Sequence, residues 1–200
     1  MKRQNGLCAI EIVAVAAIIL ILAAIGTSVR QDFEIRKSII RVRADMSSVA
    51  TAIEAYAVDN GAYPFDLDSR GWPWYITDVF TTPVAYISES FIQDPFKTAY
   101  EYYSPVSRRY RFVNYPANAP PNPWPPSPYP GPFFSRGVGP IPTATIDSGL
   151  AMFGQWKLSS SGPDKLSNST SSFFANDLIY DPTNGSISGG DIILSQRKRR

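Results

Sequence analysis

The 200-residue sequence contains no histidine and a single cysteine. Without histidine, the chain lacks the commonest general base, the histidine-paired serine and cysteine nucleophiles, and a ligand found in most zinc sites. The lone Cys8 cannot form a disulfide within the chain, and its apolar surroundings in the sequence would keep the thiol inert. These absences argue against most enzyme classes, and we expect a protein that is not an enzyme.

The chain also carries little excess charge. Its formal net charge is +2, which Lys2 and Arg3 match in number. No basic stripe typical of nucleic-acid binding is present, and the basic run at 197–200 is typical of a solvated tail. We therefore predict no nucleic-acid partner. With 44% apolar residues, the length fits one domain with an ordinary core plus an anchor.

A long apolar segment, 7–29, follows the short basic stretch that ends at Gly6. As a helix it would be roughly 34 Å long, enough to cross a bilayer, with Lys2 and Arg3 on the cytoplasmic side. Glu11 is its one charged residue, and a carboxylate inside a membrane-spanning helix indicates a function. An ordinary signal peptide cut after Gly26 is the alternative, which Glu11 and the continuing helical pattern disfavour.

The junction Gly6-Leu7-Cys8-Ala9-Ile10-Glu11 resembles the prepilin signal of type IV pilins and of type II secretion pseudopilins. The resemblance implies that a prepilin peptidase cuts between Gly6 and Leu7, removes the leader 1–6 and methylates the new amino group of Leu7. It also implies that Glu11 of one subunit meets the Leu7 amine of a neighbour in a filament. A buried carboxylate is tolerated once it is paired with a cation, which agrees with that role.

Residues 30–59 show the pattern of an amphipathic helix. Apolar residues recur at alternating spacings of four and three and so share one stripe: Ile35, Ile39, Val42, Met46, Val49, Ile53 and Tyr56. Asp59-Asn60-Gly61 is expected to end the helix, and Pro64 follows. The stripe fits a coiled-coil seam or a face packed on the chain's own sheet. The strand-like segments that follow favour the second.

Residues 60–200 are expected to form a globular, pilin-like head. The aromatic-rich segments Ala99–Tyr103 and Arg109–Tyr115 predict an antiparallel hairpin, and Met152–Ser159 and Ile187–Ser195 predict further strands. The predicted fold class is therefore α+β. A long N-terminal helix, with a membrane half and an amphipathic half, packs on a small antiparallel sheet.

Most of the chain's 18 prolines lie between residues 116 and 142. Proline removes backbone donors, so this segment cannot be a core strand or helix and is predicted to be a polyproline-like surface excursion. It either folds against its own sheet or contacts a neighbouring subunit.

A polar loop is bracketed by Ser161-Gly162-Pro163-Asp164 and Ser188-Gly189-Gly190-Asp191. Together with the helix ending, Asp94-Pro95-Phe96 and Gly190-Asp191-Ile192 are similar to segments of the major pseudopilins. That resemblance implies a calcium site with Asp164 and Asp191 among its ligands. Polar, glycine-rich turns also form without metal, so a metal-free turn stays open, and no other cofactor is expected.

The resemblance implies a structural subunit of a type IV pilus-like filament, most similar to a pseudopilus subunit of type II protein secretion. The implied partners are further subunits, the prepilin peptidase, and an inner-membrane platform with its ATPase. The implied location is the bacterial inner membrane, single-pass, with the head on the extracytoplasmic side.

Three different functions stay open beside this one. The first is a surface pilin for adhesion, motility or DNA uptake. The second is a membrane-anchored carbohydrate-binding module using Trp72, Trp74 and Trp124. The third is a hydrolase using Asp66 and Asp68, although neighbouring loop aspartates more often form turns.

Overall fold

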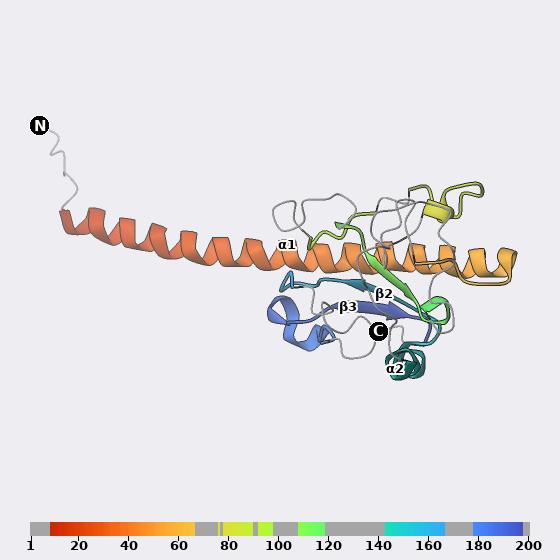
Figure 1. Cartoon of the computed structure of the whole chain (residues 1–200). Coiled ribbons are helices and arrows are strands. Elements are labelled where there is room, and N and C mark those ends of the chain that lie inside the picture. The colour runs from red at the N-terminus through yellow and green to blue at the C-terminus, as the bar shows by residue number, and fades with distance from the viewer. Residues whose placement is uncertain are drawn as a thin grey trace, which may run out of the picture. The chain divides into compact units, whose positions relative to one another are not determined.

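Figure 1 presents the computed structural model, which describes residues 9–66, 76, 78–89, 92–97, 108–118, 143–166 and 178–197. The helices are α1 (Ala9–Asn60), α2 (Thr143–Phe153) and the short 3-10 helices η1 (Asp78–Phe80), η3 (Pro116–Asn118) and η4 (Pro182–Ile187). The strands are β1 (Arg111–Asn114), β2 (Trp156–Ser160) and β3 (Ile192–Ser195). The predicted α+β class is confirmed. The chain divides into two units after Lys37, and each is described separately.

Helix α1 has 52 residues and continues without a break past the small residues of its apolar part. The hydroxyls of Thr27 and Ser28 donate to the Ala24 carbonyl at 2.8 and 3.2 Å, so these polar groups are satisfied within the helix. The helix ends at Asn60. Gly61 follows with a φ of 71° and donates its N–H to the preceding turn, a left-handed cap that favours glycine.

In the second unit, residues 38–60 of α1 bury one stripe of side chains. The buried residues are Ile39, Val42, Met46, Val49, Ala52 and Ile53. Tyr56 extends the stripe, because its ring meets Phe80 of η1 edge-on with 6.1 Å between centroids. Phe80 in turn meets Phe112 of β1 at 6.5 Å. The stripe therefore packs within its own folded unit, as the sequence predicts.

The sheet has three antiparallel strands in the order β1-β2-β3. Leu158 of the central strand β2 lies opposite Phe112 of β1 and Leu194 of β3. All five residues of β2 are buried, including Lys157, whose Nζ lies 4.8 Å from the centroid of the Phe153 ring. The sheet and the second part of α1 lie side by side (Figure 1).

Two strands begin later than the sequence predicts. Of Met152–Ser159, the strand starts only at Trp156, because Phe153 still belongs to α2. Of Ile187–Ser195, the strand starts at Ile192, because the first residue of that segment ends η4. β1 lies inside the predicted Arg109–Tyr115 segment and pairs with β2. The predicted strand Ala99–Tyr103 lies outside the described residues, as does 119–142 of the proline-rich excursion.

Helix α2 is not among the predicted elements, although the sequence carries a signal for it. Ile146, Leu150 and Phe153 are spaced by four and three residues, which places them on one helical face. Ile146 and Phe153 are buried in one cluster with Tyr115, and Leu150 packs against that cluster. Gly149 lies against the Tyr115 ring, where a Cβ would collide with the aromatic carbons.

Candidate functional site

The predicted processing and assembly residues belong to the start of the chain. Gly6 and Leu7 lie outside the described residues. Glu11 lies in the first turn of α1 as the structure describes it. Around it, the large apolar side chains from Ile10 to Val29 are each 54% to 73% exposed.

This part of α1 is long and apolar enough to span a membrane. Burying one large apolar side chain contributes about 1.5–3 kcal/mol, so the many exposed ones together strongly favour an apolar surrounding. Beyond Val29 the surface changes, with Arg36 contacting Asp32 at 2.7 Å and Lys37 contacting Glu34 at 3.9 Å. Such exposed pairs add little stability, but they indicate a helix surface that faces water.

The second predicted site, Asp164 and Asp191, lies where separate loop segments meet. Asp164 accepts the N–H of Gly190 on Oδ2 at 2.8 Å and the N–H of Leu166 on Oδ1 at 3.1 Å. The fold thus brings Asp164 to the residue that precedes Asp191. No signal in the sequence specifies these hydrogen bonds.

Two glycines permit this close approach of backbones. Gly162 and Gly190 have φ values of 68° and 103°. A Cβ on Gly162 would collide with the Gly190 carbonyl, and a Cβ on Gly190 would collide with the Leu178 carbonyl. Asp191 belongs to the same contact between backbone segments. Its N–H donates to the Leu178 carbonyl at 2.7 Å, and its carbonyl accepts the Tyr180 N–H at 2.9 Å.

Asp94, from the Asp94-Pro95-Phe96 segment, holds the end of β2. Its side chain is buried, and Oδ1 accepts the Ser160 hydroxyl at 2.8 Å and the Phe96 N–H at 3.0 Å. Its Oδ2 accepts the Ser161 N–H at 2.9 Å. The sequence distinguishes this segment by its resemblance to the major pseudopilins, but it does not indicate a role for this carboxylate.

Lys97 is a buried lysine in the same region. Its Nζ donates to the Arg109 carbonyl at 2.7 Å. Burial, assisted by the positive charge of Arg111, lowers the pKa of Lys97 to about 7, although the Asp94 and Asp191 carboxylates act in the opposite direction. Lys97 therefore lies within electrostatic range of both carboxylates.

The fit of calcium to Asp164 and Asp191 can be judged from these contacts. Calcium takes six to eight oxygen ligands. Among the residues that the structure describes, no group of three or more acidic, cysteine or histidine side chains is placed to hold a metal. Both Asp164 oxygens and the Leu178 carbonyl already accept backbone N–H groups. This donor set fits calcium poorly, and the metal stays an untested prediction.

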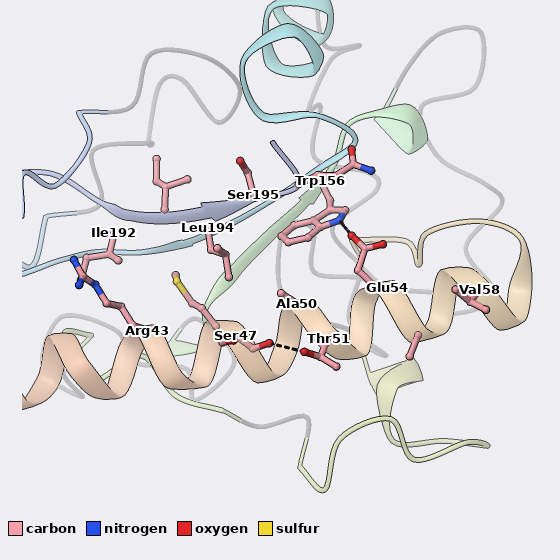
Figure 2. A pocket seen from close by; sticks show the side chains of 14 residues that line it. Arg43, Ser47, Ala50, Thr51, Glu54, Val58, Trp156, Ile192, Leu194 and Ser195 are labelled. Carbon is pink, nitrogen blue, oxygen red and sulfur yellow. Dashed lines mark hydrogen bonds between the residues drawn. The ribbon is translucent and has the colours of Figure 1, made fainter. Parts of the chain in front are cut away.

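A groove lies between α1 and β3 in the second unit (Figure 2). Its lining is mostly apolar and includes Ile192 and Leu194, with Arg43 and Glu54 as the charged side chains among the described residues around it. Glu54 accepts the Trp156 indole N–H on Oε1 at 3.0 Å, as the dashed line in Figure 2 marks. Glycoside hydrolysis needs a pair of carboxyl groups that act as acid and base, and Glu54 alone does not provide that pair.

The residues expected for carbohydrate binding or for hydrolysis are only partly described. Trp72, Trp74, Trp124 and Asp68 lie outside the described residues. Asp66 is buried, and its Oδ2 accepts the backbone N–H of Asn114 at 3.1 Å. That contact gives Asp66 a structural role at the end of β1.

Comparisons with protein-family models, with curated proteins and with solved structures find no match to this chain.

Proposed function

We propose that this chain is a membrane-anchored structural subunit of a type IV pilus-like filament. The observation that carries the proposal is helix α1. Its part from residue 9 to 29 exposes apolar side chains and one carboxylate, whereas its part from 38 to 60 buries a stripe in a folded unit. An ordinary signal sequence has no need to continue as the central helix of the mature fold.

Glu11 gives the proposal its mechanism. An acidic side chain costs roughly 3 kcal/mol at the centre of a membrane-spanning helix and less near the end, and pairing with a cation offsets that cost. The cation we propose is the Leu7 amine of a neighbouring subunit, freed when the leader 1–6 is cut after Gly6. The pair would set the axial register between subunits. Polymerisation is driven by an inner-membrane platform and its ATPase, and the chain performs no bond chemistry.

Within this class we favour a pseudopilus subunit of type II secretion, held in the bacterial inner membrane with its head on the extracytoplasmic side. Asp94 from one similar segment binds the end of β2, and Gly190 from another binds Asp164. Segments that resemble those of major pseudopilins thus contribute to one junction of the fold. A surface pilin is the second candidate, favoured by the proline-rich segment 116–142, which departs from the pseudopilin pattern.

The test is the Glu11→Ala variant, expressed with a prepilin peptidase and a pseudopilus assembly machinery. We expect membrane insertion to persist and filament yield to be lost, because the neighbour's amine has no carboxylate to meet. Glu34→Ala is the matched control, since Glu34 is an exposed carboxylate on the same helix beyond the apolar part. Wild-type filament yield from Glu11→Ala would refute the proposed mechanism. A plain anchor would tolerate that change.

A further inference from the structure

Two charged side chains of the second unit face water without an opposite charge beside them. Arg43 of α1 and Glu89, on the segment after η1, are both exposed, and neither has an ion-pair or hydrogen-bond partner among the residues that the structure describes. Arg41 lines the same pocket as Glu89, but its guanidinium lies 3.5 Å from Asp45. Arg43 and Glu89 are therefore available for a contact with another molecule.

Arg43 is the first of the α1 residues that line the groove between α1 and β3, which has a volume of about 630 Å³ (Figure 2). The other charged side chain there, Glu54, already accepts the Trp156 indole N–H and the Tyr63 hydroxyl. The exposed Val58 adds to the apolar lining. The groove thus suits an apolar segment that carries a negative charge.

Segment 84–89 of the chain has that composition. Val84 is 52% exposed, and the Glu89 carboxylate follows five residues later. This segment and β3 flank α1 on opposite sides, so the segment lies away from the groove of its own chain (Figures 1 and 2). Tyr86 ties the segment to the helix, because its hydroxyl donates to Asp59 at 2.9 Å. The fold therefore presents the segment as a surface feature beside α1.

We propose that segment 84–89 of one copy docks in the groove of the next copy, with Val84 among the apolar side chains and Glu89 against Arg43. The inference rests on the proposed filament and identifies a contact between its heads. The docking segment and the groove lie on different sides of the same unit, so each copy uses both at once. Such a heterologous contact repeats from copy to copy and builds a helical array.

The heights of the two surfaces along α1 agree with this contact. The groove lies beside α1 residues between 43 and 58, and the pocket next to segment 84–89 lies beside α1 residues between 41 and 51. Neighbouring copies therefore meet with only a small axial offset. The proposed pairing of Glu11 with a neighbour's Leu7 spans four residues, or about 6 Å along a helix, which is also a small offset.

The test measures filament yield after charge reversal, in cells that carry a prepilin peptidase and a pseudopilus assembly machinery. Arg43→Glu and Glu89→Arg should each lower the yield by at least about fivefold, because like charges then meet at every contact along the filament. The double variant Arg43→Glu/Glu89→Arg restores opposite charges and should recover at least half of the wild-type yield. Lys165→Glu is the control and should leave the yield unchanged, since Lys165 is exposed but lines neither surface.

A second measurement detects the contact itself and guards against a variant that fails to fold. In a Cys8→Ser background, Ser47→Cys places a thiol in the groove and Val84→Cys places one on the docking segment. Mild oxidation of filaments that carry both substitutions should give disulfide-linked dimers and larger species, because the two residues come from neighbouring copies. Filaments with either cysteine alone should stay largely unlinked.

The outcomes separate this inference from the proposed function. Wild-type yield from both single reversals, no recovery in the charge-swapped variant, or no linkage that requires both cysteines overturns the docking contact while filament assembly stands. A chain that forms no filaments before any substitution refutes the proposed function, and the docking contact falls with it.

Discussion

The indole N–H of Trp156 donates a 3.0 Å hydrogen bond to Glu54 and so joins β2 to α1 across 102 residues of sequence. The second Glu54 oxygen accepts the Tyr63 hydroxyl at 3.0 Å, and the Gln196 amide donates to that hydroxyl at 3.0 Å. The four side chains come from α1, the segment after it, β2 and the residue after β3. Glu54 therefore connects the helix with both the central strand and the chain that follows the sheet.

Trp156→Phe should lower the free energy of unfolding by about 1–2 kcal/mol, because Glu54 loses a partly buried donor while most of the aromatic packing remains. Urea unfolding of the full chain in detergent measures this. In a Glu54→Ala background the same substitution should cost much less, since its partner is already gone. Ser48→Ala is the control and should change the free energy of unfolding by no more than about 0.5 kcal/mol, because that exposed hydroxyl donates to a carbonyl of its own helix. Additive effects of Trp156→Phe and Glu54→Ala would contradict the coupling.

Gly162→Ala should destabilise the second unit by more than the ordinary cost of a left-handed alanine, which is about 1–2 kcal/mol. The added Cβ would collide with the Gly190 carbonyl, and backbone cannot move aside as a flexible side chain can. Gly61→Ala is the matched control, because Gly61 also has a positive φ but faces open space. Thermal denaturation of both variants measures the difference. Equal losses of stability in the two variants would mean that the backbones at Gly162 and Gly190 lie farther apart than the structure shows.

Stability should fall as the pH rises above 10. Burial, assisted by the nearby Asp45 carboxylate, raises the pKa of Tyr110 well above its ordinary value of 10.0, and its hydroxyl donates to Asp45 at 2.9 Å. The unfolded chain then loses this proton at a lower pH than the folded chain. The stabilising contribution is fully present below pH 10 and decreases above it by about 1.4 kcal/mol per pH unit.

Tyr110→Phe should flatten that alkaline slope, as measured by urea unfolding at a series of pH values. Tyr86→Phe is the comparison, because the Tyr86 hydroxyl donates to Asp59 at 2.9 Å in an exposed hydrogen bond. The pKa of Tyr86 is also raised, by partial burial and by Asp59, but the group is much more open to water. An alkaline slope that Tyr110→Phe leaves unchanged would show that Tyr110 ionises while the chain is folded.

The contrast between α1 and the junction at β2 explains what the sequence can predict. The apolar segment, the stripe from Ile39 to Ile53 and the glycine after Asn60 depend on local periodicity and local turn chemistry, so they are visible in the sequence. The Glu54–Trp156 bond and the bonds of Asp94 with Ser160 and Ser161 depend on tertiary packing between distant segments. No local pattern encodes which carboxylate accepts a hydrogen bond from which distant donor.

The prediction closest to the proposed function concerns the mature N-terminus. Intact mass of the protein extracted from membranes should correspond to a methylated Leu7, because the proposed cut after Gly6 would leave α1 intact. Gly6→Val should block this cut. Gly26→Val is the matched control, since a Cβ at Gly26 meets open space and a signal peptidase would need a small residue there. A mature chain starting at Thr27, abolished by Gly26→Val, would instead establish a secreted head without an anchor, and a binding function would replace assembly.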